Sequence, residues 1–271
     1  MNYLSRYQTA LVTGCASGIG FLMAREMLER GVPRLVAWDN RPEALEEAAQ
    51  KLRETGGAVT TQTVDVTDRE SVDRALGEVR ESGISIDVLI NNAGIVTGGP
   101  FALQSPEAIR ATMEVNSLAP MLLARELLPG MIERDRGHIV NISSAAGMLG
   151  NPDMATYSAS KWALTGWSDS LHLEMERAES GVKVLTVAPY YIDTGMFEGV
   201  RSPLLPILDP GRTAARIVRA IDRGSRHLRM PWIVNLLPML RGLLPSRLFD
   251  KVVGDWFGIY DSMKTFKGRD R

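Results

Sequence analysis

Thr13-Gly14-Cys15-Ala16-Ser17-Gly18-Ile19-Gly20 joins a short apolar run to a segment of helical periodicity. Residues 9–13 before it predict a buried strand, and residues 19–28 predict a helix. Gly14 permits the tight turn, Gly18 lets a pyrophosphate approach the backbone, and Gly20 lets helix and strand pack closely. The helix start offers free N–H groups to phosphates. We therefore expect dinucleotide contacts at Gly14, Ser17, Gly18, Ile19 and Gly20.

Strands and helices alternate along the rest of the chain. Short, apolar, β-branched runs predict buried strands at residues 34–38, 58–64, 86–90, 138–142 and 182–187. Helical stretches begin near Pro42, Asp68, Pro106 and Ala155. This alternation predicts an α/β fold of the Rossmann type, with a doubly wound parallel sheet in three αβα layers. We expect one dinucleotide-binding and catalytic domain over residues 1–232 and a C-terminal extension over residues 233–271.

Composition narrows the function classes. The net charge of −1 argues against broad binding to nucleic acid, which requires a basic surface. Cys15 is the single cysteine, and no signal segment precedes the first strand, so we expect a reducing, cytoplasmic location. The three histidines are scattered without ligand spacing, so no metal site is expected.

Asp39 ends the second predicted strand, about 20 residues after the glycine loop, which is the usual position of a ribose-binding carboxylate. A carboxylate there accepts hydrogen bonds from the adenosine ribose and repels a 2′-phosphate. Arg41 lies close enough in sequence to offset part of that repulsion. Asp39 therefore favours NAD over NADP, and a solvated turn before Pro42 is the alternative interpretation.

Tyr157 and Lys161 are four residues apart at the start of a predicted helix, so both side chains project from one face. A tyrosine hydroxyl exchanges a proton with an alcohol or ketone oxygen if its pKa of about 10 is lowered. A cation about 4 Å away stabilises the ionised tyrosine by about 4 kcal/mol at an effective dielectric of about 20. Lys161 or an oxidised nicotinamide can supply this cation. Ser144 is expected to hold the substrate oxygen, with Ser143 as the competing assignment.

Together, the glycine loop, Ser144, Tyr157 and Lys161 resemble the short-chain dehydrogenase/reductase family over residues 8 to about 232. The resemblance implies catalytic roles for Asn116, Ser144, Tyr157 and Lys161. In the family, the asparagine holds a water that links the lysine to solvent through a kinked backbone, and the lysine also fixes the nicotinamide ribose. The further cofactor contacts that it implies are Asp65, Val66, Asn92, Ala93, Gly94, Tyr157, Lys161, Pro189, Ile192 and Thr194. Tyr190 stands where the family usually has glycine, which leaves the backbone under the nicotinamide in question.

Residues 35–39, 194–197 and 263–269 are similar to the branch of retinol and 17β-hydroxysteroid dehydrogenases. That branch implies hydride transfer between the cofactor and a bulky lipophilic alcohol or its aldehyde or ketone. Asp39 adds the expectation that the cofactor is NAD, and that oxidation is therefore the physiological direction, because the cellular NAD pool is mostly oxidised. One rival function is an NADP-dependent carbonyl reductase. Another is a non-catalytic nucleotide-sensing protein on the same fold.

The end of the chain differs from the rest in charge and hydrophobicity. From Arg226 to Arg271 there are nine Lys or Arg and four Asp or Glu, a net charge of +5. Residues 231–249 are apolar but are interrupted by prolines and arginines, which argues against a spanning helix. We expect this tail either to lie on a membrane surface or to cover the substrate pocket or a subunit contact. The family resemblance also implies a homodimer or homotetramer.

Overall fold

The computed structural model describes residues 3–202, 205–256 and 258–268. Arg269 and the last two residues of the expected extension, together with residue 257, lie outside this part. Seven strands are present in it: β1 (Thr9–Thr13), β2 (Arg34–Asp39), β3 (Ala58–Thr63), β4 (Val88–Asn91), β5 (Gly137–Ile142), β6 (Val182–Pro189) and β7 (His227–Met230). The helices described are α1 (Gly18–Glu29), α2 (Pro42–Arg53), α3 (Arg69–Glu81), α4 (Pro106–Met113), α5 (Ala119–Glu133), α6 (Ala155–Arg177), α7 (Pro210–Asp222), α8 (Leu237–Leu243) and α9 (Ser246–Phe249).

The strands form one parallel sheet in the order β3-β2-β1-β4-β5-β6-β7. After β3 the chain crosses back to the other side of β1, so β1 and β4 are neighbours although two strands separate them in sequence. Loops leaving these two carboxyl ends diverge, and this is where open α/β sheets bind their ligands. The sheet order and the flanking helices confirm the predicted Rossmann-type fold.

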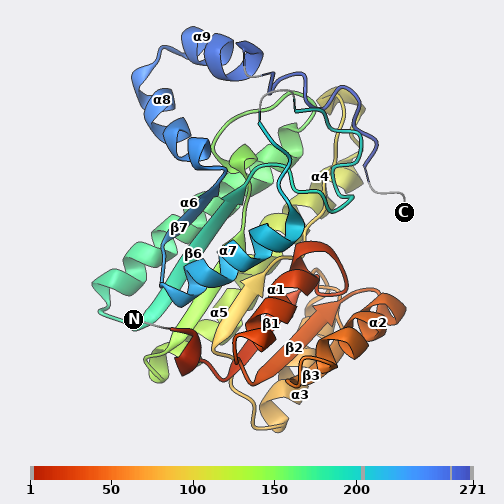
Figure 1. Cartoon of the computed structure of the whole chain (residues 1–271), viewed down its shortest axis with the longest axis vertical. Coiled ribbons are helices and arrows are strands. Elements are labelled where there is room, and N and C mark those ends of the chain that lie inside the picture. Colours follow the sequence, from red (N-terminus) through yellow and green to blue (C-terminus); the bar gives the residue numbers. More distant parts are fainter. Residues whose placement is uncertain (1–2, 203–204, 257, 269–271) are drawn as a thin grey trace.

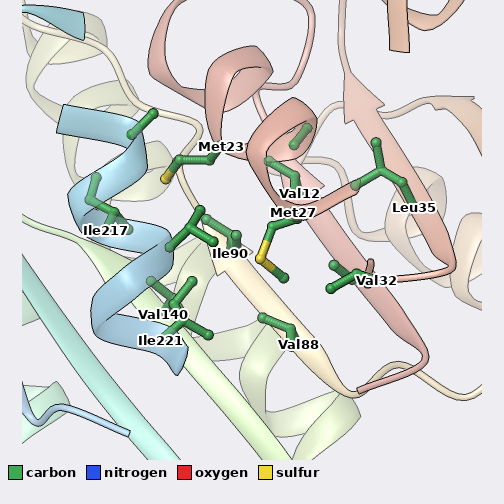
Figure 2. Packing of buried hydrophobic residues seen from close by; sticks show 14 of the residues in the cluster. Val12, Met23, Met27, Val32, Leu35, Val88, Ile90, Val140, Ile217 and Ile221 are labelled. Carbon is green, nitrogen blue, oxygen red and sulfur yellow. The ribbon is translucent and has the colours of Figure 1, made fainter. Parts of the chain in front are cut away.

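Helices cover both faces of the sheet (Figure 1). On one face, α1 and α7 lie side by side, and Met23, Met27, Ile217 and Ile221 pack on Val12 and its neighbours from other strands (Figure 2). On the other face, α3, α5 and α6 cover alternate strand residues such as Leu11. Each fully buried apolar side chain of this size contributes about 1.5–3 kcal/mol, so the two layers stabilise the sheet that holds the loops.

Two parts of the sheet differ from the sequence prediction. β3 was expected to be buried, but it is an edge strand whose residues are exposed or half-buried. Its Thr and Gln side chains suit an edge strand, because one side of such a strand is exposed to solvent. At the other edge, β7 and the helix α7 before it were not predicted. His227-Leu228-Arg229-Met230 is short and carries two charged or polar residues, so it lacks the apolar run of a central strand.

The chain beyond β7 packs over the carboxyl end of the sheet. Val234, Leu237, Phe249, Val253 and Ile259 join a third apolar cluster that also contains residues 145–157 and 188–200. Figure 1 shows α8 and α9 at the end of the molecule beyond β7. In the described ranges, no helix is both long and apolar enough to cross a membrane. The cluster places this tail beside the functional loops.

Candidate active site

The glycine loop adopts the conformation that its sequence predicts. Gly14 has φ of 66° and Gly18 has φ of 60°, in the left-handed region that favours glycine. A Cβ on Gly20 would meet the carbonyl oxygen of Gly14 and the side chain of Asn92. Helix α1 begins at Gly18 with Ser17 as its N-cap residue, so the free N–H groups of the first turn lie at the loop.

A second loop, after β4, is held against the glycine loop by hydrogen bonds. Asn92 Nδ2 donates to the carbonyl oxygens of Thr13 (2.9 Å) and Gly14 (3.1 Å). Thr13 Oγ1 in turn accepts from the backbone N–H groups of Asn92 and Ala93, both at 3.0 Å. The Asn92 side chain therefore fixes the shape of the loop, and its amide group has partners within the protein.

Asp39 is buried at the end of β2 and has partners on both carboxylate oxygens. Oδ2 accepts from the backbone N–H of Ala16 (3.0 Å), and Oδ1 accepts from Nε of Arg41 (3.0 Å). Arg41 Nη2 also donates to Ser17 Oγ at 3.0 Å. Arg41 thus lies between the Asp39 carboxylate and the start of α1. Asp65 turns its carboxylate to its own loop, where Oδ1 accepts from Thr67 N at 2.9 Å.

Ser144 and Tyr157 meet across the cavity, although twelve residues separate them. Ser144 follows β5 and its Oγ accepts from the backbone N–H of Ala146 at 3.1 Å, which leaves its proton free for another partner. Its hydroxyl is hydrogen-bonded to Tyr157, on the first turn of α6. Ser143 also lines the cavity, but its hydroxyl is hydrogen-bonded to Thr165 Oγ1 (2.7 Å) and to the Lys161 carbonyl (3.1 Å). The geometry therefore favours Ser144 over Ser143.

Burial shifts both titratable groups away from their ordinary pKa values. Loss of solvation raises the pKa of Tyr157 to about 12, although its hydrogen bond to Ser144 acts to lower it. Burial lowers the pKa of Lys161 to about 8. Lys161 Nζ lies 5.7 Å from the centre of the Tyr157 ring and donates to the Ile142 carbonyl at 2.8 Å. In the protein alone, burial outweighs any lowering of the Tyr157 pKa by Lys161.

Asn116 lies in a π-helical turn, Glu114–Leu118, between α4 and α5. Its Oδ1 accepts from Ile95 N and its Nδ2 donates to the Ile95 carbonyl, both at 2.9 Å. Nδ2 also donates to Ser160 Oγ at 3.0 Å. A Cβ on Gly94 would lie 3.2 Å from Asn116 Oδ1 and 3.7 Å from Lys161 Nζ, so these groups meet at one point. The π-turn is the kinked backbone that the family resemblance implies.

Tyr190 fits the position that the family usually gives to glycine. It is not among the residues with positive φ, so its backbone needs no glycine. Its N–H donates to the Met230 carbonyl at 2.7 Å, which extends the pairing of β6 and β7. The ring packs against Tyr191, with centroids 4.6 Å apart. Tyr190 thus forms part of the wall of the cavity, in a backbone conformation that does not require glycine.

One cavity of about 740 Å³ unites nearly all the predicted site residues. Gly20 and Asn116 lie behind its wall, and the remaining predicted positions line it: Gly14, Ser17, Gly18, Ile19, Asp39, Asp65, Val66, Asn92, Ala93, Gly94, Ser144, Tyr157, Lys161, Pro189, Ile192 and Thr194. The sequence argument missed the far end of the cavity, lined by Leu149, Asn151, Met154, Tyr191, Phe197 and Ile259. No local pattern marks these residues, because loops and tail bring them together only in the fold.

Comparison with known proteins gives the family. The family model described as short chain dehydrogenase matches residues 8–204. The chain belongs to the short-chain dehydrogenase family. As a short-chain dehydrogenase it is an oxidoreductase that binds a nicotinamide dinucleotide, and the glycine loop and the Tyr157 constellation fall inside the matched residues.

Named relatives extend over almost the whole short-chain dehydrogenase chain. Epidermal retinol dehydrogenase 2 of Mus musculus is 35% identical over 269 residues, covering 97% of this chain and 86% of the relative. Estradiol 17-beta-dehydrogenase 11 of Pongo abelii is 33% identical, covering 91% of this chain and 86% of the relative. A metagenomic short-chain oxidoreductase, whose crystal structure is a complex with NADP, is 32% identical with a TM-score of 0.69, covering 82% of this chain and 96% of the other.

Proposed function

We propose that this short-chain dehydrogenase oxidises bulky lipophilic alcohols with NAD, or reduces the matching carbonyls, with Tyr157 as general acid and base. The observation that carries the proposal is that Tyr157 and Ser144 lie between the dinucleotide loops and an apolar end of the same cavity. The similarity to retinol and estradiol dehydrogenases supports a lipophilic substrate. NAD, when bound, supplies the hydride acceptor.

Each residue of the constellation has one task in the proposed oxidation. Ser144 donates to the substrate oxygen, and the Tyr157 hydroxyl oxygen takes the proton from it. Tyr157 must be ionised for this step, and burial opposes ionisation. A positive charge is therefore required nearby, from Lys161 and from the oxidised nicotinamide ring. Asn116, beside Lys161 Nζ at Gly94, holds a water that returns the proton to solvent.

The proposed preference for NAD rests on the Asp39 carboxylate, and the charge of Arg41 acts against this preference. The buried carboxylate would repel a 2′-phosphate, whereas the guanidinium 3.0 Å away would attract one. Because Asp39 is buried and Arg41 is half exposed, solvent screens the charge of the carboxylate less than that of the guanidinium. We expect kcat/KM to be higher with NAD than with NADP, and Arg41→Ala to widen that difference. A higher kcat/KM with NADP would favour the carbonyl reductase function instead.

The test of the activity is oxidation of retinoids, steroids and long-chain alcohols by the purified chain with NAD. We expect turnover that falls by at least about a hundredfold in Tyr157→Phe, because the proton acceptor is removed. The variant Tyr260→Phe, a tyrosine outside the cavity, is the matched control. Full activity of Tyr157→Phe, or no oxidation of any of these alcohols by the wild type, would contradict the proposal.

We also propose that the chain forms a homodimer or homotetramer through α5 and α6. A shallow groove between them is lined by Met121, Leu128, Ile132, Trp167 and Leu171. The same two helices carry exposed apolar side chains, Leu122 and Ile132 on α5 and Trp162 and Leu173 on α6. Such side chains favour burial against a second copy. Mass measurement by light scattering in solution checks this, since a monomer at micromolar concentration would contradict it.

The tail is proposed to serve two roles, covering the pocket and contacting a membrane surface from the cytoplasmic side. Ile259 on the cavity wall supports the first role. The exposed Trp232, Leu243 and Trp256, which are 66–72% accessible, support the second. Co-sedimentation with anionic vesicles tests the second role, with Trp232→Ser as the variant and Leu103→Ser, an exposed apolar residue outside the tail, as control. Equal, negligible pelleting of all three proteins would contradict membrane contact.

A further inference from the structure

The end of the tail is fastened to the loop that follows β6. We call residues 262–267 of the tail the strap. The backbone N–H of Lys267 donates to the Glu198 carbonyl at 2.9 Å, and Thr265 Oγ1 donates to the Gly199 carbonyl at 2.6 Å. Hydrogen bonds to backbone atoms therefore hold the strap in one position against this loop.

Phe266, within the strap, packs between two loops. A Cβ on Gly98, in the loop after β4, would lie only 2.5 Å from the Phe266 ring, so the ring lies directly on the backbone of that loop. Glycine is required at this close approach, because any side chain would overlap the ring. The same ring contacts Phe197, in the loop after β6, with centroids 6.5 Å apart.

Phe197 connects this packing to the catalytic tyrosine. Its ring centroid lies 5.8 Å from that of Tyr157, with the two planes 82° apart, and 5.0 Å from that of Tyr191. Such edge-to-face contacts are a favoured arrangement of aromatic rings. Phe197 also lines the cavity together with Tyr157. The Tyr157 ring thus packs against Phe197, and Phe197 packs against Phe266.

We propose that Phe266 is a positioning residue, which acts on Tyr157 through Phe197. Ser144 holds the hydroxyl end of Tyr157 by a hydrogen bond, and Phe197 restricts the rotation of its ring. A displacement of about 1 Å at a reacting group can cost about a hundredfold in rate. This inference rests on the proposed alcohol oxidation, because it states how the general acid and base of that reaction is held in place.

The first test removes the Phe266 ring and measures oxidation of a lipophilic alcohol with NAD. We expect Phe266→Ala to lower kcat by about tenfold, because the proton acceptor is less well placed, while the Kd for NADH stays unchanged. Phe101→Ala, which removes an exposed ring after β4, is the matched control. A rise in KM with unchanged kcat would overturn the inference, because it would indicate a role in the cavity wall only.

A double-mutant cycle tests whether the effect passes through Phe197. In the Phe197→Ala background, Phe266→Ala should lower kcat by less than about twofold more, because the ring that it supports is already absent. Losses that multiply in full would show that the two rings act independently, and would overturn the inference.

Gly98→Ala reaches the same ring from the loop after β4. The new Cβ would overlap the Phe266 ring, so we expect a loss of kcat here too. Adding Phe266→Leu should recover part of this loss, because the smaller side chain leaves room for the methyl group. Gly150→Ala, whose Cβ would meet nothing within 4 Å, is the control. A double variant slower than Gly98→Ala would contradict the contact.

A spectroscopic measurement lets this inference fail separately from the proposed function. Burial raises the pKa of Tyr157 to about 12. If Phe266→Ala loosens the packing, water stabilises the tyrosinate and the pKa falls towards its ordinary value of about 10. This variant should then show tyrosinate absorbance at about pH 10 that is absent after the further change Tyr157→Phe. Such absorbance supports the positioning role even if no alcohol is oxidised, and a spectrum unchanged from wild type would overturn it.

Discussion

At the cofactor end of the cavity, the loops after β1 and β4 are joined by hydrogen bonds to backbone atoms, as Asn92 and Thr13 show. At the substrate end, side chains from three separated segments pack on one another, and Tyr157, Tyr191, Phe197 and Phe266 form a continuous set of ring contacts. Backbone geometry tolerates few changes, whereas side-chain packing can be rebuilt for another substrate. The comparison indicates a fixed cofactor site beside an adaptable substrate site.

The largest effect is expected at the cofactor end, in Gly20→Ala. The new Cβ would overlap the Gly14 carbonyl and the Asn92 side chain, which are both held in place. We expect the free energy of unfolding to fall by about 3 kcal/mol or more and NADH binding to be lost. Thermal denaturation and NADH fluorescence measure both.

Gly77→Ala is the control for this change. Gly77 also lies within a helix, but a Cβ there would meet nothing within 4 Å. We expect this variant to be between neutral and about 1 kcal/mol more stable, because alanine favours helix. An equal loss of stability in both variants would contradict this prediction, because it would show that any alanine in a helix is destabilising and that the contact with the loop has no special effect.

A smaller effect is expected at the substrate end, in Arg241→Ala. Arg241 Nη1 donates to the Met148 carbonyl at 3.0 Å, and the guanidinium lies 4.5 Å from the Trp162 ring centre. Its loss should lower the free energy of unfolding by about 1–2 kcal/mol and raise KM for the alcohol. The Kd for NADH should stay the same as in the exposed control Arg247→Ala. A higher Kd for NADH in Arg241→Ala would contradict the idea that the cofactor end and the substrate end of the cavity are independent.

The smallest effect is spectroscopic and concerns Tyr157, which lies between the two ends. Because burial raises its pKa to about 12, the free protein should show no tyrosinate absorbance from this residue up to about pH 10. The positive charge of the oxidised nicotinamide ring favours the tyrosinate and should lower this pKa. The difference spectrum between wild type and Tyr157→Phe, with and without NAD, measures it. An unchanged spectrum on adding NAD would contradict the electrostatic argument.

The sequence predicted the central strands and the site residues that depend on local order. Glycine spacing, the strand before Asp39 and the four-residue step from Tyr157 to Lys161 are all local patterns. β7 escaped prediction because a short edge strand with polar residues lacks an apolar run. The pKa of Tyr157 could not be predicted either, since spacing along a helix does not reveal how far burial outweighs a neighbouring cation.

By itself, the sequence determined the family, the central strands and the glycine loop, because residues close in sequence form these features. Only the tertiary structure distinguished the surroundings of Ser143 from those of Ser144, and only it brought Asn151, Tyr191 and Ser262 together. Such contacts join residues up to 111 positions apart. They depend on how the tail returns to the carboxyl end of the sheet, and no local periodicity encodes that path.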